Sequence, residues 1–344
     1  MKKPVVAILG ATGAVGQEFI RLIEERQFPY SKLILLASSR SAGKKMSVNG
    51  HVYTVEEATP ESFTGVDIGL FAGGAISKTL APEAAKRGCV VIDNSSAFRM
   101  DKTVPLVIPE INAADIAMHQ GIIANPNCST IIMLMALKPI YDLSPITKII
   151  VSTYQAVSGA GKEGIEELET EVKDFLQGKE MQAHILPTKS LDTHYPIAFN
   201  LIPHIDVFLD NDYSKEEMKM VHETHKILHQ DTIAITATTV RVPVFRSHAE
   251  SIYVETEEPV SVEAVRQALD AFPGVQVEDD PVHMKYPMPL YTSEKYDCYV
   301  GRIRKDLYNE KAVNLWVCGD QIRKGAALNA LQIAEYMLAH DLLL

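Results

Sequence analysis

The sequence predicts an α/β protein of two domains, in which a doubly wound parallel sheet precedes a domain of longer strands and separate helices. Up to about residue 125, short apolar runs alternate with helical patterns, as in a parallel sheet with crossover helices. These runs are apolar throughout, as expected where helices cover both faces of a sheet. After Cys128 the runs lengthen, which indicates an α+β arrangement. A chain of 344 residues is also long enough for two domains.

The first domain is predicted from the order of its strands and helices. Strands are expected at 5–9, 33–37, 68–71 and 90–92, with helices at 15–26 and 81–87. A last helix, from about residue 326 to 340 and preceded by Gly325, is expected to return to this domain. We therefore expect one domain at 1–127 plus about 325–344, and a second at 128–324.

The second domain is predicted to hold strands at 149–154, 233–242, 251–255, 298–303 and 313–318. One amphipathic helix has glutamates opposite an apolar face made of Ile165, Leu168, Val172, Phe175 and Leu176. A second helix starts at Ser214, which forms a capping box with Glu217. Its expected apolar stripe consists of Met218, Val221, His225 and Leu228. Glu216 and Lys219 are then neighbours on a different face.

Composition excludes several classes of protein. A formal net charge of -11 argues against a general nucleic-acid binder, which needs a basic surface. The 4 cysteines form no CxxC pair, so we expect no disulfide framework, no metal site and a reducing, cytoplasmic location. The start at residues 1–4 has no cleavage-site pattern, and no apolar run approaches the ~20 residues that cross a bilayer. Secretion and membrane insertion are therefore not expected.

Cys128, in the run ANPNCST at 124–130, is predicted to lie in the first turn of a helix. Pro126 ends the preceding strand, Asn127 can cap the helix, and the apolar run that follows is expected to end before Pro139. Free amides and the positive end of the helix dipole stabilise a thiolate there, which makes the sulfur a nucleophile. A buried structural cysteine is the commoner alternative. The assignment therefore depends on partners elsewhere in the chain.

A glycine-rich turn, GATGAVG at 10–16, follows the first strand and opens the first helix. Glycines in this position let the backbone approach a pyrophosphate, while amides at the helix start point at the anion. The spacing GxxGxxG differs from the commoner GxGxxG, and an ordinary strand–helix turn is the alternative. The position favours a Rossmann-type dinucleotide site, with expected contacts from Gly10, Thr12, Gly13, Ala14 and Val15.

The second strand ends in ASSRS at 37–41, without the acidic residue that holds the ribose hydroxyls in NAD enzymes. Arg40 can instead make a charge-assisted contact with a 2′-phosphate, and Ser41 or Ser38 can add a hydroxyl donor. A solvated loop arginine is the alternative. The sequence therefore favours NADP as the cofactor.

Four motifs occur in order along the chain: GATGAVG, PNCST, STYQAVSGAG at 152–161 and RVPVFRSHAES at 241–251. Together they resemble the aspartate-semialdehyde dehydrogenases, in particular the form common in Gram-positive bacteria. The resemblance extends from Val5 to the last helix. One departure is His204, where relatives often carry an aromatic residue.

The resemblance implies a covalent reaction at Cys128. Its sulfur attacks the aldehyde, the resulting thiohemiacetal loses a hydride to the nicotinamide, and phosphate cleaves the thioester to give an acyl phosphate. His248 is implied as the general acid/base, since imidazole titrates near neutral pH. Gln155 is implied to orient the acyl group. Most of the 11 histidines are assigned to other roles, because a lone histidine is usually structural.

The resemblance also implies a set of binding residues. Arg241 would hold the substrate carboxylate, and Glu216 its amino group. Lys219 and Arg99 would bind phosphate, with a hydrogen bond from Asn127 nearby. For Glu216 and Lys219 an exposed ion pair is the alternative. Further cofactor contacts are implied at Ser158, Gly159 and Gln321.

The resemblance implies that the reaction runs towards the aldehyde, in lysine, methionine, threonine and diaminopimelate synthesis. It also implies a homodimer formed through the second domain, small-molecule substrates, and no nucleic-acid or membrane partner. N-acetyl-glutamyl-phosphate reductase is the nearest rival, but its usual PGCY motif does not fit Asn127 and Ser129. A glyceraldehyde-phosphate type of enzyme would carry Thr-Thr-Asn after the cysteine, and that pattern is absent here. A relative that kept the fold but lost its chemistry is a further alternative, which the joint presence of Cys128, Gln155, Arg241 and His248 disfavours.

Overall fold

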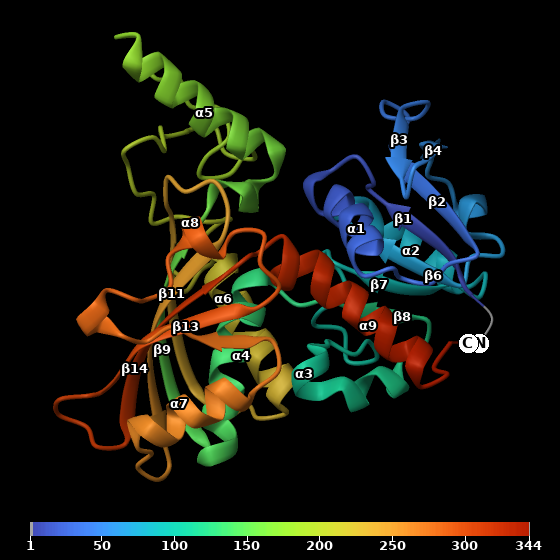
Figure 1. Ribbon diagram of the computed structural model, residues 1–344. Helices are drawn as coiled ribbons and strands as arrows, with labels where there is room; N and C mark the ends of the chain where they lie inside the picture. The colour runs from blue at the N-terminus through green and yellow to red at the C-terminus, as the bar shows by residue number, and fades with distance from the viewer. Residues whose placement is uncertain (1–2, 344) are drawn as a thin grey trace. The chain divides into compact units, whose positions relative to one another are not determined.

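A computed structural model describes residues 3–343 and divides the chain into two compact units (Figure 1). The first unit comprises Met1–Asn127, Lys226–Leu228 and Gly325–Leu344, and the second comprises Cys128–His225 and His229–Lys324. Residues 1, 2 and 344, which the sequence assigns to the first domain, lie outside the described part. The predicted fold class, a doubly wound parallel sheet plus an α+β domain, is confirmed.

The sheet of the first unit has six strands in the order β5-β2-β1-β6-β7-β8, all parallel. The strands are β1 (Val5–Leu9), β2 (Lys32–Ala37), β5 (Glu56–Glu57), β6 (Ile68–Phe71), β7 (Val90–Asp93) and β8 (Ile122–Ala124). The order runs outward in both directions from β1 and β6. Chain connections therefore reverse between these two strands, which is where such sheets bind ligands, beyond the carboxyl ends of the strands.

Helices and short segments complete the first unit. Its helices are α1 (Ala14–Glu25), α2 (Ser77–Ala85), α3 (Pro109–Asn112) and α9 (Leu328–Ala339), and a hairpin is formed by β3 (Lys45–Val48) and β4 (His51–Thr54). Right-handed crossovers that leave the centre in opposite directions place α1 and α2 on opposite faces of the sheet. The last helix, α9, packs against α1, α3 and the strands β6 and β7. The alternating apolar runs of the sequence thus become a sheet that helices cover on both sides.

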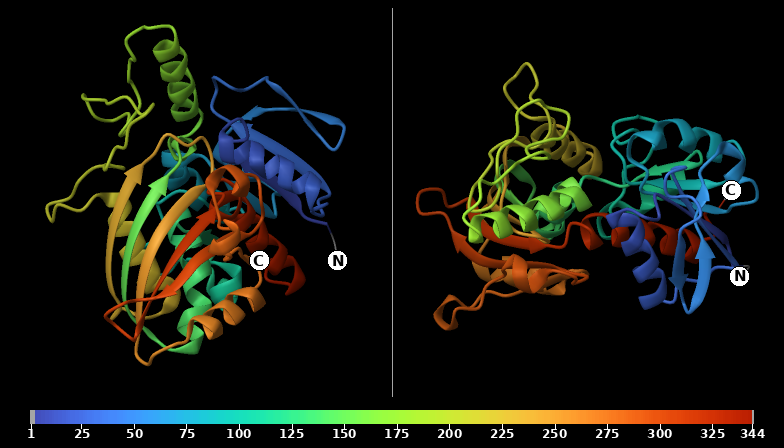
Figure 2. Two further views of the ribbon diagram at one scale, coloured as in Figure 1. Left: turned by 60° about the vertical axis from the view of Figure 1, so that its left-hand side comes forward. Right: turned by 90° about the horizontal axis from the view of Figure 1, so that it is seen from above.

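The second unit is built on a mixed six-stranded sheet in the order β10-β9-β11-β14-β13-β12 (Figures 1 and 2). The strands are β9 (Ile146–Gln155), β10 (Ala234–Arg241), β11 (His248–Thr256), β12 (Val275–Val277), β13 (Cys298–Lys305) and β14 (Ala312–Gly319). β10 is parallel to β9, whereas β11 is antiparallel to both β9 and β14. The carboxyl ends of β9 and β10 therefore meet the amino end of β11 at one edge of the sheet.

The helices of the second unit are α4 (Cys128–Leu143), α5 (Lys162–Leu176), α6 (Lys215–Leu228, except for its last three residues), α7 (Val262–Ala271) and α8 (Pro289–Thr292). α4 packs along one face of the sheet, against β9, β11, β13 and β14. It begins at Cys128, as predicted, but continues through Pro139 instead of ending before it. Proline removes one backbone donor. Here the helix is buried on nearly every side, and packing outweighs that loss.

Helices α5 and α6 correct the sequence-based assignment of their inward faces. In α5, Phe175 and Leu176 are exposed, whereas Glu167 and Glu171 are buried. The Glu167 carboxylate accepts hydrogen bonds from the amides of 184–186, and Glu171 accepts those of Ile197 and Ala198. These bonds explain the burial, because buried carboxylates need donors.

In α6 the residues of the predicted stripe, Met218, Val221, His225 and Leu228, are only half-buried. The fully buried positions are Glu216, Glu217, Met220, Glu223, Thr224 and Ile227. The predicted capping box is confirmed, since the Ser214 amide donates to Glu217 Oε2 over 2.7 Å and the Glu217 amide donates to Ser214 Oγ over 3.3 Å. The helix therefore turns the face that carries Glu216 inward.

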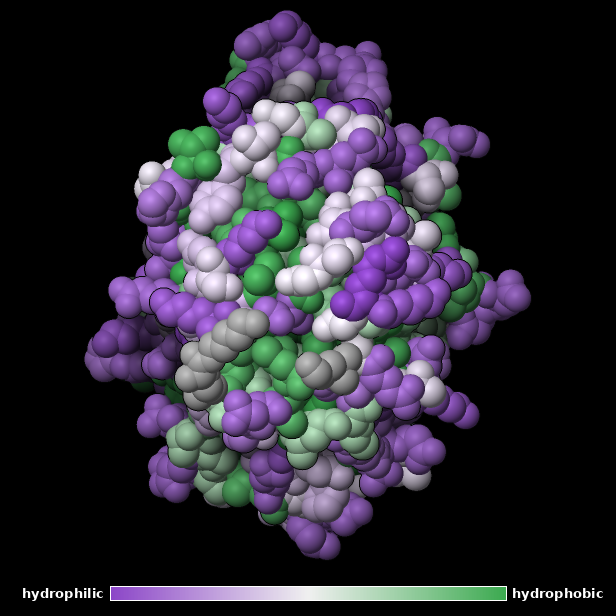
Figure 3. Space-filling view, turned by 90° about the vertical axis from the view of Figure 1, so that its right-hand side faces the viewer, coloured by the Kyte–Doolittle hydropathy of each residue, from purple (hydrophilic) through white to green (hydrophobic). Residues whose placement is uncertain are grey.

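The face shown in Figure 3 is covered largely by hydrophilic residues, with apolar groups between them. Within residues 3–343, no helix combines the length and apolar composition that crossing a membrane requires.

Candidate active site

Three of the proposed site residues lie at one edge of the second sheet. Gln155 ends β9, Arg241 ends β10 directly opposite it, and His248 begins β11. All three are buried. They come from neighbouring strands whose pairing is fixed by main-chain hydrogen bonds. The sheet therefore brings together residues that are far apart in the sequence.

Cys128 lies beside His248 at this edge. Its Sγ atom is 3.5 Å from His248 Nε2. Cys128 is also the half-exposed cysteine, whereas Cys89, Cys298 and Cys318 are buried. Burial raises the pKa of Cys89 to about 12 and also raises the pKa of Cys318, so neither thiol is ready to ionise. Cys128 is therefore the cysteine whose surroundings suit a nucleophile.

The amide of Ala156 fixes the protonation of His248. It donates to Nδ1 over 3.1 Å, so Nδ1 is an acceptor and the ring proton is on Nε2, facing the sulfur. Burial, together with the nearby positive charge of Arg241, lowers the pKa of His248 to about 3, although Glu216 acts in the opposite direction. Imidazole is therefore neutral at this site and donates a hydrogen bond to Cys128 Sγ.

Arg241 is buried, and one of its hydrogen-bond donors is unused among the described residues. Its Nη1 atom donates to Ala156 O over 2.8 Å, while its Nε has no hydrogen-bond partner among residues 3–343. Burial lowers the pKa of this guanidinium, although the charges of Glu216 and Cys128 act against the shift. A buried cation with an unsatisfied donor matches a carboxylate, which accepts two parallel hydrogen bonds from guanidinium.

Glu216 connects α6 to this cluster. Its Oε1 accepts from Gln155 Nε2 over 3.2 Å, and its Oε2 is 2.9 Å from Lys219 Nζ. Lys219 also contacts Asp206 over 2.9 Å. Burial alone would lower the pKa of Lys219, but the carboxylates of Glu216 and Asp206 raise it. Gln155 also donates to Ser129 Oγ on α4, so its side chain is held from two helices.

Gly159 lies against Arg241, and its neighbour Ser158 is hydrogen-bonded to Gln321. Gln321 Nε2 donates to Ser158 Oγ, and Gln321 Oε1 accepts from the Ser247 amide over 2.8 Å. A Cβ atom on Gly159 would lie only 2.6 Å from Arg241 Nη1. Glycine at this position is therefore required by the close approach of the guanidinium.

The glycine-rich turn of the first unit has the shape that a phosphate requires. Gly10 has a φ of 81°, and a Cβ there would meet Ala72 O at 2.5 Å. A Cβ on Gly16 would lie 2.1 Å from Gly10 O, so α1 can start here only without a side chain. Thr12 Oγ1 donates to Ser41 Oγ over 3.4 Å, which links the turn to the end of β2. Arg40, beside Ser41, is exposed and makes no ion pair within residues 3–343.

Arg99 and Asn127 belong to the first unit and are both buried there. Arg99 donates from Nε to Asn125 O over 2.9 Å and from Nη2 to Asn94 O over 2.8 Å. These two carbonyls follow β8 and β7, so the guanidinium is held at the carboxyl edge of the first sheet. Asn127 directly precedes Cys128 in the chain.

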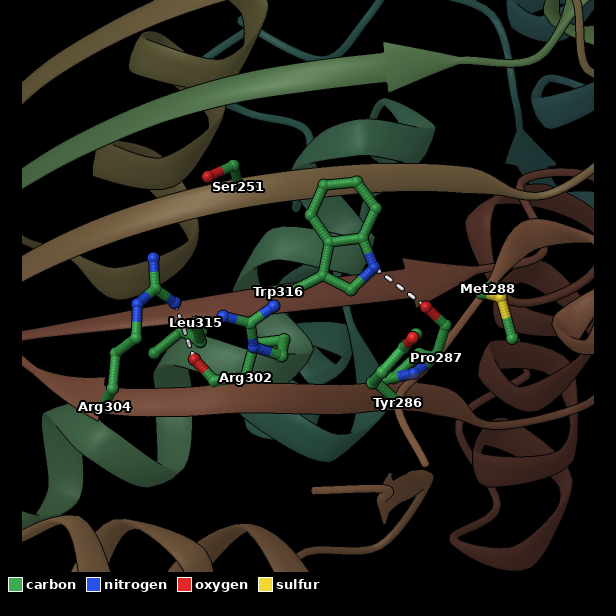
Figure 4. A pocket seen from close by; sticks show the side chains of 8 residues that line it. All are labelled: Ser251, Tyr286, Pro287, Met288, Arg302, Arg304, Leu315 and Trp316. Atoms are coloured by element: carbon green, nitrogen blue, oxygen red, sulfur yellow. Dashed lines mark hydrogen bonds between the residues drawn. The ribbon is translucent and has the colours of Figure 1, made fainter. Parts of the chain in front are cut away.

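A pocket of about 280 Å³ lies elsewhere, on the other face of the second sheet (Figure 4). It is lined by Ser251, Tyr286, Pro287, Met288, Arg302, Arg304, Leu315 and Trp316. Ser251 and His248 are three positions apart on β11, so they point to opposite faces. Trp316 donates from its indole nitrogen to Pro287 O over 2.9 Å. This pocket therefore contributes nothing to the chemistry of Cys128. Among residues 3–343, no cluster of His, Cys, Asp and Glu could hold a metal ion.

Three contributing residues are not indicated by the sequence patterns: Ser129, Ala156 and Asp206. Ser129 directly follows the cysteine, so its place in the motif is the signal that could have indicated it. Ala156 acts through its main chain, which leaves no signal in the sequence. Asp206 meets Lys219 only through a tertiary contact.

The chain is similar to known proteins over nearly its whole length. Residues 5–119 match the family described as semialdehyde dehydrogenase, NAD binding domain, and residues 137–324 match semialdehyde dehydrogenase, dimerisation domain. The aspartate-semialdehyde dehydrogenase of Bacillus subtilis is 52% identical over 96% of each chain. The structure of aspartate semialdehyde dehydrogenase II from Vibrio cholerae, complexed with ASA, superposes with a TM-score of 0.93 and 45% identity, over 98% of this chain and 99% of that one. The Candida albicans enzyme with NADP gives a TM-score of 0.75 and 25% identity, over 99% and 100%.

Proposed function

The chain belongs to the aspartate-semialdehyde dehydrogenase family, and on this premise we propose that it reduces L-aspartyl 4-phosphate to L-aspartate 4-semialdehyde with NADPH. In reverse, the enzyme oxidises and phosphorylates the aldehyde. The observation that carries the proposal is the contact of 3.5 Å between Cys128 Sγ and His248 Nε2, beside the buried cation of Arg241. A nucleophile, a proton donor and a carboxylate ligand thus share one sheet edge.

Cys128 forms a covalent intermediate in this scheme. In the reductive direction its thiolate attacks the acyl carbon of aspartyl phosphate, a C–S bond forms, and the C–O bond to phosphate breaks. NADPH, when bound, supplies the hydride that reduces the acyl carbon. The C–S bond then breaks, the aldehyde leaves and the thiolate returns. In the opposite direction phosphate attacks the same thioester, and the sulfur leaves.

His248 serves as the acid/base group of this reaction, and it enters the cycle as a neutral donor. Its Nε2 proton stabilises the thiolate at rest. When the sulfur binds carbon, the same proton is available to the oxygen that gains negative charge. A proton can be accepted at Nδ1 only if the bond from the Ala156 amide is given up. Donation is therefore its first role.

The other side chains position the substrate. Arg241 binds the α-carboxylate through its Nε and remaining Nη donors, and Glu216 binds the amino group. Gln155, held by Ser129 and Glu216, orients the acyl oxygen. Lys219 and Arg99 bind the phosphate, with Asn127 as a further donor. The carboxylates of Glu216 and Asp206 keep Lys219 charged before substrate binds.

The residues present fit NADP. Gly10, Gly13 and the amides of Thr12, Ala14 and Val15 form the turn for the pyrophosphate. Arg40 and Ser41 would hold the 2′-phosphate, since Arg40 is exposed and makes no ion pair with an acidic residue in the described part of the chain. Ser158, Gly159 and Gln321 would contact the nicotinamide part. In this proposal the first domain, at 1–127 plus about 325–344, carries the phosphate contacts of the cofactor. The second domain, at 128–324, carries the nicotinamide contacts together with Cys128 and His248.

The assembly and cellular setting are also part of the proposal. The chain forms a homodimer through its second domain, as the family description of residues 137–324 suggests. Alternate residues of β9, among them Ile150, are exposed or half-buried on the sheet face opposite α4, and this face is the one that we assign to a second copy. The enzyme acts in the cytoplasm, in lysine, methionine, threonine and diaminopimelate synthesis.

The direct test follows NADPH absorbance during incubation with aspartate semialdehyde, phosphate and NADP. We expect reduction that depends on phosphate, and a loss of at least about 10³-fold in kcat for Cys128→Ser, because an alcohol does not ionise at neutral pH. Nucleotide binding, followed by fluorescence quenching, should be unchanged in this variant. Full turnover by Cys128→Ser, or no phosphate dependence in the parent enzyme, contradicts the proposal.

A further inference from the structure

Asn329, in the first turn of α9, uses both protons of its side-chain amide inside the first unit. One goes to Val107 O over 2.9 Å and the other to Asn125 Oδ1 over 2.7 Å. Asn329 is fully buried, and both acceptors lie beside the carboxyl edge of the sheet. A buried amide with both donors used fixes the group that it contacts.

Asn329 contacts Asn125, whose other hydrogen bonds fix further groups in place. Its side-chain nitrogen donates to Asn94 Oδ1 over 3.0 Å and to Ala326 O over 3.4 Å. Its main-chain amide donates to Asp93 O over 2.8 Å, and its carbonyl accepts from Arg99 Nε over 2.9 Å. Asn125 is thus held through its backbone and through its side chain, and Arg99 depends on its carbonyl.

The side-chain amides of Asn329, Asn125 and Asn94 can be oriented in only one way. At one end Asn329 must donate, because Val107 O cannot. At the other end the Asn94 amide donates to Phe71 O over 3.0 Å, which turns Asn94 Oδ1 towards Asn125. Reversing the central amide of Asn125 would set donor against donor and acceptor against acceptor. The arrangement is therefore a single, fully determined network.

We propose that Asn329 is a positioning residue for phosphate: through Asn125 it holds Arg99 in the orientation that the anion requires. The inference rests on the proposed function, because it takes Arg99 as the phosphate ligand. Asn94 is the third member, and its own carbonyl holds the Nη2 atom of Arg99. The network thus includes both residues whose main-chain carbonyls hold the guanidinium of Arg99.

Asn329→Asp tests this role, because aspartate keeps the shape and loses both donors. Two oxygens would then face Val107 O and Asn125 Oδ1, which moves Asn125 and the carbonyl that it offers to Arg99. We expect the KM for phosphate to rise about tenfold, with the KM for NADP unchanged. An unchanged KM for phosphate overturns the inference.

A double variant separates positioning from a general structural effect. With Arg99→Ala as the background, Asn329→Asp should add no further rise in the KM for phosphate, because its effect passes through Arg99. Equal rises in both backgrounds would show a purely structural role and overturn the proposal. Gln332→Ala is the matched control, since it removes a hydrogen bond of 2.8 Å from the same helix to Glu110. It should leave the KM for phosphate unchanged.

Asn94→Ala provides a second test of the network if the buried aspartate of Asn329→Asp prevents folding. Asn94 is only half-buried, and the substitution keeps its main-chain carbonyl. A rise of several-fold in the KM for phosphate is expected, and no rise refutes the network. Failure of the proposed function is distinct, since the parent enzyme would then show no phosphate-dependent activity at all.

Discussion

The two arginines assigned to substrate anions, Arg99 and Arg241, are held in different ways. Arg99 donates to two main-chain carbonyls, and three side-chain amides fix one of them in place. Arg241 donates to one carbonyl, and its Nε has no partner among the described residues. The guanidinium of Arg99 is therefore held rigidly, and most of its donors are used. Arg241 is buried with a hydrogen-bond donor that is still available to a ligand.

The difference reflects what each arginine must recognise. A buried, under-bonded guanidinium is costly until a carboxylate arrives, so it rejects ligands that lack that group. Phosphate has more oxygen atoms and a higher charge, and a cation in the right position suffices to bind it. The less-bonded arginine should therefore be the more sensitive to substitution.

The largest effect is expected for Arg241→Lys. Lysine keeps the charge but cannot make two parallel hydrogen bonds, and it leaves the carboxylate poorly matched. We expect kcat/KM for aspartate semialdehyde to fall about 10²- to 10³-fold, and Arg99→Lys to cost clearly less with the same substrate. Steady-state kinetics check the order, and equal losses would remove the distinction between the two arginines.

A smaller effect is expected for Gly159→Ala. The added Cβ would lie 2.6 Å from Arg241 Nη1, so the guanidinium must shift. A displacement of this size should lower kcat/KM about 10- to 100-fold, with little change in thermal stability. In the Arg241→Lys background the same change should cost little, since lysine has no Nη1. A full additional loss there would show that Gly159 acts independently of Arg241.

The smallest effect concerns pH and stability. The pKa of His248, about 3 in the folded chain, lies below its usual value near 6.5. The unfolded chain therefore binds the proton more readily, so this group's stabilisation is present above pH 6.5 and is lost as the pH falls towards 3. We expect the parent to lose about 1.4 kcal/mol per pH unit more than His248→Asn between pH 6 and 4. Urea unfolding measures both proteins, and parallel curves contradict the shift.

Much of the fold could be predicted from sequence, because apolar runs, and the residues that begin or end helices and strands, indicate local structure. The start of α4 at Cys128 and the capping box of α6 both depend on residues close in sequence. The continuation of α4 through Pro139 could not be predicted, because it depends on burial by the sheet. Local signals therefore located the elements better than their ends.

The inward face of α6 shows why part of the site was missed. Hydrophobic periodicity selects Met218 and Val221, yet the buried face carries Glu216 and Glu217. Glu217 is buried because its Oε1 accepts from the Thr239 amide of β10 over 3.0 Å. Such a partner is 22 residues away and unknown until the chain has folded. Glu216 was identified through the family resemblance, and its orientation needed the structure.

The pairing of β10 with β9 sets a limit on how this site can change. Arg241 faces the cluster because it stands opposite Gln155 in the register of these strands. Inserting one residue into β10 would turn Arg241 to the far face of the sheet, since side chains alternate along a strand. Insertion or deletion of an odd number of residues before Arg241 within β10 would therefore abolish activity. Divergence among such enzymes must use insertions in loops and substitutions on helices.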